Sequence, residues 1–406
     1  MDNVTHVLAG MLLAEVVVQH RASREEVAPA WRRWAYVVSA AANNIPDLDI
    51  LYTGITEGKL GYLAHHRGHT HTLAFALLQA LLSLGLLRAL RRFHAGWSVR
   101  DRRWMLFLAA MGPLLHLAMD GGNNYGVHPF WPIDSHWYYG DRMFIVEPLL
   151  WASLAPALAF SVRSRIAAAV LGLIALAGVV LSWTTGMVPR PLAGLVTLVT
   201  LVVGVVAWWT SSARRVAVAA TAALATYALF IGVGTRARQL LLAASADVLD
   251  EQLLDAALTP LPANPLCWSF NSIALSGSEV VLRRGVVLPL SGEKKGLCPE
   301  RGGASTAPLQ GVTFDPQAEV QVHQIMRYPR SALTRAAAEC HAALFLQWAR
   351  IPYVAQEDDT TIVGDLRYDF DPSIEWAEIA LPPEGTACPA FVPGWIAPRR
   401  ELLVGR

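Results

Sequence analysis

Apolar residues are concentrated before about residue 240, in long runs that short polar segments separate. A helix that crosses a membrane needs about 20 apolar residues. The first two runs are the weakest. Pro46 and two carboxylates end the second run. Either run can be a half-helix that the protein buries. The pattern predicts eight candidate spans, at 4–20, 33–46, 72–90, 104–119, 144–162, 166–186, 192–210 and 216–235.

The pattern changes in the last part of the chain. Residues 237–258 repeat apolar positions at helical spacing, which predicts a membrane-proximal helix, and the Pro-rich stretch 259–268 ends it. Residues 272–290 alternate like strands joined by turns, and 360–370 has the same character. Residues 333–350 have the spacing of a helix. The tail is therefore expected to be an α+β domain.

Composition agrees with a membrane protein that carries a soluble tail. Of the 406 residues, 54% are hydrophobic and 16% are charged, whereas a soluble domain has roughly 25% charged residues. The net charge of +1 shows no basic excess of the kind that nucleic-acid binding requires, so we expect no nucleic-acid partner. The predicted fold is an all-α polytopic membrane domain of about eight spans (1–236), the proximal helix (237–258) and a small extracytoplasmic α+β domain (259–406).

Arginine is distributed unevenly between the two sets of loops. Loops on the cytoplasmic side of a membrane carry an excess of basic residues. One set holds Arg21, Arg24, Arg32, Arg33, Arg88, Arg91, Arg92, Arg100, Arg102, Arg103, Arg163, Arg165, Arg214 and Arg215. The other set holds Lys59, Arg67, Arg142 and Arg190. The first set is therefore expected in the cytoplasm, with the tail on the opposite side of the membrane.

All four cysteines, Cys267, Cys298, Cys340 and Cys388, belong to the tail. An even number of cysteines confined to an extracytoplasmic domain is typical of disulfides. We therefore expect two disulfides, of which three pairings are possible, against the alternative of four buried thiols.

Histidines and acids cluster on the predicted outer side. A single histidine or aspartate there is usually an interfacial group, a core polar group or a turn residue. Many of them at the ends of consecutive spans instead indicate function, because ionisable groups at membrane depth are costly. Imidazole and carboxylate without thiolate form the ligand set of catalytic zinc or manganese. The candidates are His6, Asp47, Asp49, His65, His66, His69, His71, His116, Asp120, His128, Asp134, His136, Asp141 and Glu147.

These residue types suit hydrolysis by metal-activated water. A divalent metal lowers the pKa of a bound water to about 7. Carboxylates can bridge two or three metals, while histidines hold the geometry. Arg67, within the histidine run, can hold a phosphate oxygen. Its alternative roles are a salt bridge to Asp47 or Asp49, or an interfacial anchor.

Five motifs, "MDNVTH", "NIPDLD", "HRGHTH", "HLAMD" and "FIVEPLLW", occur in this order between the apolar runs. In them the chain resembles the YdjM-like family of bacterial membrane-bound metal-dependent hydrolases, over about 1–160 and again at "PANPLCW" (262–268). The resemblance implies that the family's recurrent elements fall on His6, Asp47, Asp49, His66, Arg67, His71, His116 and Asp120.

Two other residues are given roles by the same resemblance. Relatives often have Asp where this chain has Glu147, so the acid can serve as a further ligand or a general base. Asp141 occupies a familiar position in "DRMFI", where it can orient a ligand. His65 and His69 stand where the motifs vary, so neither is expected to bind metal. The family is in turn similar to bacterial zinc phospholipases C and to zinc nucleases specific for single strands, an analogy that favours phosphoester hydrolysis.

The sequence and this resemblance thus predict a metal-dependent hydrolase of the bacterial cytoplasmic (inner) membrane, with its metal site and tail facing outward. We expect one to three zinc ions, or manganese, on His6, Asp47, Asp49, His66, His71, His116 and Asp120, with catalytic roles for Arg67, Asp141 and Glu147. The expected partners are the lipid bilayer and a lipid or envelope ester, most plausibly a phosphoester. A transporter or metal channel is one alternative, although 166–181 and 192–207 offer only Thr197 and Thr200 as polar residues. A scaffold with a structural metal is the other.

Overall fold

All eight segments expected as spans form helices. They are α1 (Asn3–Ala22), α2 (Pro29–Ala42), α4 (Leu73–Ala89), α5 (Val99–Asp120), α6 (Pro148–Ser161), α7 (Arg165–Thr184), α8 (Arg190–Trp209) and α9 (Ser212–Ala246). A 3-10 segment, η1 (Ile45–Ile55), and the short α3 (Gly58–His65) lie between α2 and α4. The computed structural model describes residues 1–56, 58–89, 96–246, 248, 250–290, 298, 318–368, 376–383 and 385–403. Arg91 and Arg92 lie outside the described residues.

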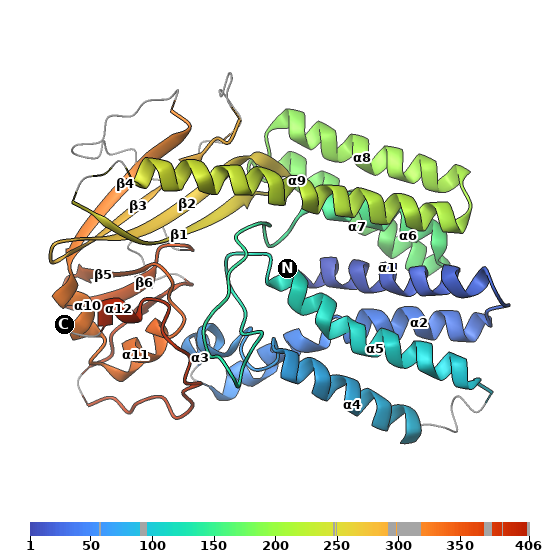
Figure 1. Ribbon diagram of the computed structural model, residues 1–406, viewed down its shortest axis with the longest axis horizontal. Helices are drawn as coiled ribbons and strands as arrows, with labels where there is room; N and C mark the ends of the chain where they lie inside the picture. Colours follow the sequence, from blue (N-terminus) through green and yellow to red (C-terminus); the bar gives the residue numbers. More distant parts are fainter. Residues whose placement is uncertain are drawn as a thin grey trace.

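These eight helices lie side by side in one bundle, and the strands lie beyond one of its ends (Figure 1). Because consecutive helices run in opposite directions, the arginine-rich turns, such as 23–28 and 162–164, lie at the end far from the sheets. The N-terminus, the end of α5 and the start of α4 lie at the end near the sheets (Figure 1). We call this second end the sheet end of the bundle.

Within the described residues, three helices are long and apolar enough to cross a membrane, namely α7, α8 and α9. The apolar helices α4 and α6 are shorter, at 17 and 14 residues. Helix α2 also has 14 residues, and charged side chains such as Glu15 and Arg103 lie inside α1 and α5. The expected count of about eight spans is therefore not confirmed.

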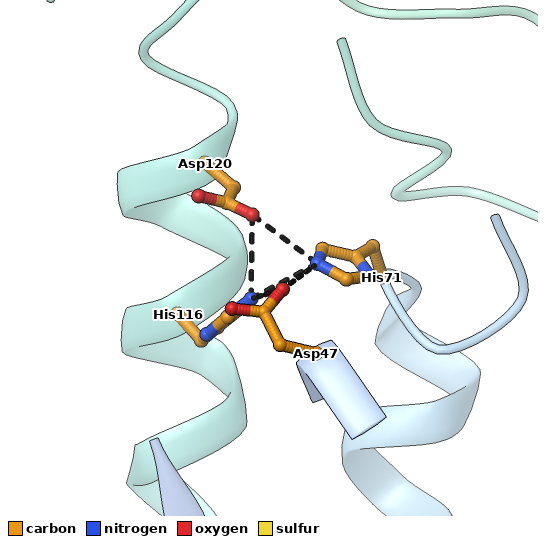
Figure 2. Close-up of side chains that lie close together, drawn as sticks. All are labelled: Asp47, His71, His116 and Asp120. Atoms are coloured by element: carbon orange, nitrogen blue, oxygen red, sulfur yellow. Dashed lines mark hydrogen bonds and ion pairs between the residues drawn. The ribbon is translucent and has the colours of Figure 1, made fainter. Parts of the chain in front are cut away.

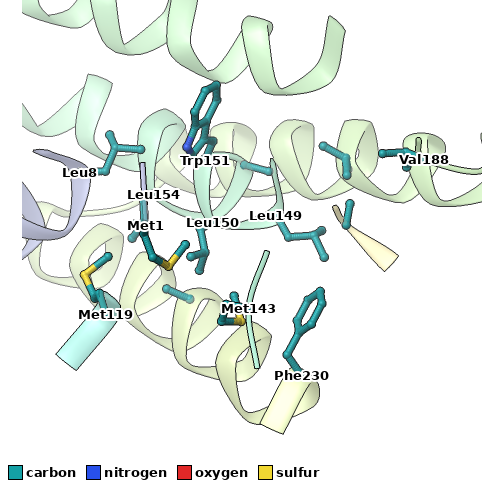
Figure 3. Packing of buried hydrophobic residues seen from close by; sticks show 14 of the residues in the cluster. Met1, Leu8, Met119, Met143, Leu149, Leu150, Trp151, Leu154, Val188 and Phe230 are labelled. Atoms are coloured by element: carbon teal, nitrogen blue, oxygen red, sulfur yellow. The ribbon is translucent and has the colours of Figure 1, made fainter. Parts of the chain in front are cut away.

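Helix α6 is the centre of the bundle. Twelve of its 14 residues are buried, where α1, α7, α8 and α9 surround it. Figure 3 shows Leu149, Leu150 and Trp151 of this helix packed with Leu8 of α1 and Phe230 of α9. The segment that enters α6 is therefore fixed from several sides, and it contributes residues to the sheet end of the bundle.

The tail contains two antiparallel sheets and confirms the expected α+β class. The first has the order β1 (Gln252–Leu261), β2 (Asn264–Ser276), β3 (Glu279–Val287) and β4 (Val320–Pro329). The second has the order β5 (Pro352–Glu357), β6 (Thr360–Asp365) and β7 (Glu378–Ala380). Three short helices complete the domain, α10 (Arg330–Ala336), α11 (Cys340–Leu346) and α12 (Arg400–Leu403).

The prediction of a helix at 237–258 is wrong for the second half of this range. Helix α9 continues to Ala246, and β1 begins at Gln252. Residues 252–261 are strand because they pair with β2 along its length, a long-range interaction that local spacing does not contain. The Pro-rich stretch 259–268 forms the end of β1, the turn at 262–263 and the start of β2. The single helix expected at 333–350 is divided into α10 and α11.

Helix α9 connects the bundle to the four-stranded sheet (Figure 1). It runs out of the bundle and packs on β1 and β2. A Cβ on Gly234 would lie 2.4 Å from the ring of Trp268, so glycine is required for this close approach. Trp268 is fully buried, and its ring centroid lies 6.4 Å from that of Phe230. The sheet is thus held directly against the bundle.

Two disulfides join Cys267 to Cys298 and Cys340 to Cys388. Both expected bonds are confirmed, and the fold selects this pairing from the three that were possible. The Cα–Cα distances of 5.5 and 5.6 Å lie within the range of unstrained disulfides.

We predict that nonreduced tryptic digests contain linked peptides for 267–298 and 340–388. Mass spectrometry of protein alkylated before denaturation will test this, because disulfide-bonded cysteines do not react with the alkylating reagent. The reduced and alkylated protein is the control, and it should yield the four peptides separately. Linked peptides with a different pairing, or four alkylated thiols in the nonreduced sample, would contradict the arrangement.

Candidate metal centre

Four side chains from three segments converge at the sheet end of the bundle (Figure 2). His71 Nε2 lies 3.3 Å from Asp47 Oδ1 and 3.2 Å from Asp120 Oδ2. His116 Nε2 lies 3.4 and 3.3 Å from the same two oxygens. The two Nε2 atoms are 2.9 Å apart. We call Asp47, His71, His116 and Asp120 the four-residue group.

Local structure explains how these segments present their side chains. His116 and Asp120 are four residues apart on α5, so they share one face of the helix. Asp47 belongs to η1, which begins directly after Asn43 and Asn44 have ended α2. His71 lies in the turn that precedes α4. The start of η1, the turn before α4 and the end of α5 thus meet at one point.

Hydrogen bonds assign the protons on the two rings. The Asn43 carbonyl accepts from His116 Nδ1 at 2.7 Å, so Nε2 of that ring carries a lone pair. Thr70 Oγ1 donates to Asp49 Oδ2 at 2.8 Å and lies 2.9 Å from His71 Nδ1, whose proton it can accept. Both Nε2 lone pairs therefore face each other and two carboxylates. Such groups repel unless a proton or a metal cation lies between them.

The spacing of the ligand atoms also suits a cation. A tetrahedral zinc site with bonds of about 2.0–2.1 Å places its ligand atoms about 3.3–3.4 Å apart. Five distances within the four-residue group lie between 2.9 and 3.4 Å. Three of the four side chains are fully buried, and that of Asp47 is 12% exposed. The residues therefore fit a divalent metal in both chemistry and spacing.

A second group of possible ligands adjoins the first. Asp47, Asp49 and His66 also offer ligand atoms within 4.8 Å of one another. Because Asp47 belongs to both groups, its carboxylate is placed to bridge two ions, as in two-metal sites. A third set, Glu339, Cys340 and His341, includes a disulfide sulfur and lies in the tail.

Asp49 organises the histidine-rich turn. It accepts hydrogen bonds from the Arg67 backbone N–H at 3.0 Å and from Thr70 at 2.8 Å, and it lies 2.9 Å from His66 Nδ1. Arg67 has a φ of +60°, a left-handed conformation that is uncommon for a residue with a side chain. The bond to Asp49 helps to hold this conformation, which directs the buried Arg67 side chain into the site.

Arg67 and His6 both contact Asp120. Arg67 Nε lies 3.1 Å from Asp120 Oδ2, and its Nη1 donates to Asn123 at 2.8 Å. His6 Nε2 lies 3.1 Å from Asp120 Oδ1, and its ring stacks on that of His116 at 3.8 Å. The amine of Met1 contacts the same oxygen. His6 therefore stands beside the four-residue group, on the other oxygen of a shared carboxylate.

The electrostatics of the site favour ionised acids. Burial disfavours the charge on Asp47, but His116 and His71, when protons on their Nε2 atoms are donated to this carboxylate, outweigh burial and hold its pKa well below its usual range. Burial likewise opposes ionisation of Asp49, and His66 and His71 lower its pKa. With Asp120, three carboxylates in this region can balance a cation.

Glu147 and Asp141 are placed differently from the predicted ligands. Glu147 caps α6 by accepting from Leu149 N–H, and it also accepts from Ala263 N–H of the β1–β2 turn. Burial raises the pKa of Glu147 to about 8. Asp141 pairs with Arg350 of the tail at 2.8 and 2.9 Å, beside a separate cavity of about 390 Å³. Both acids therefore connect the bundle to the tail.

The remaining histidines of this side do not join the four-residue group. His65 lies 3.2 Å from the Phe391 carbonyl, and His69 contacts the rings of Trp131 and Trp395. His128 is stacked on Trp395 at 3.9 Å. His136 is 59% exposed and pairs with Asp134.

Trp395 of the tail packs beneath the histidine-rich turn. A Cβ on Gly68 would lie 2.8 Å from both this ring and the His65 carbonyl oxygen. The Trp395 indole N–H donates to the Ala64 carbonyl at 2.7 Å. The turn that carries His66, Arg67 and His71 is thus packed directly against the tail.

Sequence reasoning missed several residues that support the site. Asn43 fixes the His116 ring through its carbonyl, and Asn123 holds Arg67. Thr70 connects Asp49 to His71. The adjacent "NN" and "GGNN" sequences next to the ligand motifs were a usable signal. No sequence signal pointed to Trp395, because it lies more than 300 residues along the chain from the turn that it supports.

A cavity of about 690 Å³ adjoins the site. Its lining begins at His66 and Arg67 and extends to Phe144 at the sheet end, Leu261 of β1 and Trp376 of the tail. We call it the interdomain cavity. Its size is that of a site for a small organic ligand.

Comparison with known families supports the same region of the chain. The family model described as YdjM inner membrane protein matches residues 1–189, which include the four-residue group and Arg67. The resemblance that the motifs indicated is confirmed for these residues, and an inner-membrane location is supported. No curated protein and no solved structure matches the chain. The similarity expected at 262–268 lies outside the match and stays a prediction.

We predict that His116→Ala and Asp120→Ala lose bound divalent metal, because each substitution removes one of the four proposed ligands of the four-residue group. The metal content of dialysed, detergent-purified protein should fall roughly tenfold or more, as measured by inductively coupled plasma mass spectrometry. His136→Ala is the control, since His136 is exposed and lies outside the group. Asp120→Asn, which keeps the shape of the side chain, separates lost ligation from lost folding. Equal metal content in folded variants and wild type would remove the ligand assignment.

Proposed function

We propose that this protein is an inner-membrane, metal-dependent hydrolase that cleaves an ester, most plausibly a phosphoester, of a lipid or envelope substrate. The observation that carries the proposal is the convergence of Asp47, His71, His116 and Asp120 within 4.8 Å, next to a cavity that Arg67 also lines. These ligand types suit zinc, with manganese as the alternative. A metal bound there would supply Lewis-acid activation of water and of the ester.

Arg67 is proposed to bind and orient the substrate. Its side chain reaches Asp120 at one side and lines the interdomain cavity at the other. A guanidinium presents a planar fork of donors that matches the oxygens of a phosphate. Asn123 holds Nη1 of this side chain in place, so that the charge is already oriented before a substrate arrives.

His66 is proposed to serve either as a ligand of the second group or as the residue that exchanges a proton. It lines the cavity, and its Nδ1 donates to Asp49 at 2.9 Å. That bond fixes the ring and leaves Nε2 as the free nitrogen. Burial lowers the pKa of His66 despite the opposing effect of Asp49, which favours the neutral ring that either role requires.

Glu147 and Asp141 are proposed to position the site and not to act in the chemistry. Each is engaged with the tail, through Ala263 and Arg350. Together they hold the loop 121–147, which contains Asn123 and Tyr125, between the bundle and the tail. This differs from the two roles that the sequence left open for Glu147, a further metal ligand or a general base.

The rival functions are less well supported. A transporter needs polar groups along a path through the bilayer. The buried faces of α7, α8 and α9 are instead formed mainly by Ala, Val, Leu, Gly and Phe. A scaffold with a structural metal would need no adjoining cavity, whereas one side of this site is bordered by about 690 Å³ of open space.

The proposed orientation places the site and the tail outside the cytoplasm. The arginine-rich turns lie at the opposite end of the bundle from the site, as the positive-inside rule requires for that orientation. The two disulfides of the tail are typical of an oxidising compartment.

We predict that purified protein hydrolyses dioctanoyl phosphatidate, that a chelator stops the reaction and that zinc or manganese restores it. Arg67→Lys should lower kcat/KM roughly 10- to 100-fold, because an ammonium cannot replace the fork of donors. Released phosphate is the measurement. Arg100→Lys is the control, since Arg100 is 63% exposed. Metal-loaded wild type that cleaves neither this lipid nor other phosphoesters would favour the scaffold.

We predict that a membrane-impermeant maleimide labels Thr184→Cys but not Ser23→Cys in cells whose outer envelope admits the reagent. Thr184 ends α7 at the sheet end, and Ser23 follows α1 at the far end. Both positions are exposed, and lysed cells, in which both should react, are the control. Labelling of the Ser23→Cys protein in intact cells would reverse the orientation.

A further inference from the structure

The interdomain cavity has walls from both domains. One wall is the turn and loop around the metal centre, represented by Arg67 and Tyr125. A second contains Phe144 and Met187, close to the connection between α7 and α8. The tail supplies the third, with Leu261, Tyr368 and Trp376. The cavity is therefore incomplete without the C-terminal domain.

Aromatic rings from both domains meet at this cavity. The Trp376 centroid lies 5.1 Å from that of Tyr368, 6.0 Å from that of Tyr62 and 6.3 Å from that of Tyr125. Trp376 remains 41% exposed, so much of its ring is not used in the packing of the protein. Exposed aromatic surface of this kind is available to a ligand.

The charge of the lining selects between classes of ligand. Arg67 and Arg367 line the cavity, and no carboxylate does so within the described residues. Arg367 is balanced by Asp365 at 2.7 Å, whereas Arg67 shares Asp120 with His71 and His116. The guanidinium of Arg67 already lies 5.1 Å from the Tyr125 ring centroid. An aromatic site that already contains arginine side chains favours an anionic ligand group over a quaternary ammonium.

The part of the cavity away from Arg67 is apolar. Phe144, Ile145, Met187 and Leu261 line it, and Ile145 is 46% exposed. Met187 follows α7, which is long and apolar enough to cross a membrane. With α7 spanning the membrane, this end of the cavity would lie where the bilayer ends, and a ligand could keep an apolar chain there while its head reaches Arg67.

We infer that the interdomain cavity binds the phosphate ester of an amphiphile and that the C-terminal domain supplies the wall which selects it. The phosphate lies at Arg67, and the first part of the apolar chain lies against Phe144, Met187, Leu261 and the face of Trp376. This inference rests on the proposed function for the reaction, and it adds where the phosphate and the apolar chain bind and the role of the tail.

Binding of nonhydrolysable probes tests the inference. Dodecylphosphonate has the proposed charge and chain, methylphosphonate lacks the chain, and dodecyltrimethylammonium reverses the charge. Each is titrated into full-length, metal-loaded protein in nanodiscs, with empty nanodiscs as the correction for partitioning. Calorimetry should give dodecylphosphonate at least roughly tenfold tighter binding than either comparison compound, because only it fills both ends of the cavity.

Variants of the tail provide the matched test. Trp376→Ala should weaken dodecylphosphonate binding roughly tenfold and leave methylphosphonate unchanged. Phe391→Ala is the control, because Phe391 is a tail aromatic that is 55% exposed and outside the cavity. An intact Cys340–Cys388 disulfide and an unchanged elution volume will show that Trp376→Ala folds.

The outcomes separate this inference from the proposed function. Equal binding of dodecylphosphonate by Trp376→Ala and wild type, or equally tight binding of the ammonium compound, would overturn the inference even if phosphoesters are hydrolysed. The expected probe order without hydrolysis of any phosphoester would support the binding site and reject the reaction.

Discussion

The structure depends on keeping carboxylates and imidazole lone pairs together in a buried space at one end of a helical bundle. Burying an ionised group costs several kcal/mol unless other charges and hydrogen bonds compensate. Here the compensation comes from Asn43, Thr70, Arg67 and, in the function we propose, a divalent metal. Because each ligand is held by a separate neighbour, the arrangement requires the helix ends, the histidine-rich turn and the tail to be in place at once.

The bundle meets this requirement through short connections and a central helix. Helix α6 is buried on nearly all sides, so the loop before it cannot move independently of α1, α8 and α9. Helix α5 presents His116 and Asp120 together because of its 3.6-residue period. The apolar packing around Trp151 and Leu150 thus has a functional consequence, since it sets where the polar residues at the sheet end can lie.

The tail is part of the site and not an appended domain. Trp395 supports the histidine-rich turn at Gly68, Arg350 binds Asp141, and Glu147 holds the β1–β2 turn. Two of these contacts involve acids for which the motif resemblance predicted catalytic roles. The hydrogen bonds of Asp141 and Glu147 place both side chains at the junction between the domains.

Local sequence determined the helical segments, the α+β class of the tail, the presence of disulfides and six of the candidate ligands that the structure brings together, because apolar periodicity and short motifs carry that information. It did not fix the number of membrane spans, since an apolar run does not reveal whether its charged residues face protein, as Glu15 does with Arg32. Tertiary structure decided that Gln252–Leu261 is a strand, which cysteines pair, and that His6 stands beside the four-residue group. It also decided that Asp141 and Glu147 face the tail. Each of these depends on partners distant in sequence, whose energies no local pattern contains.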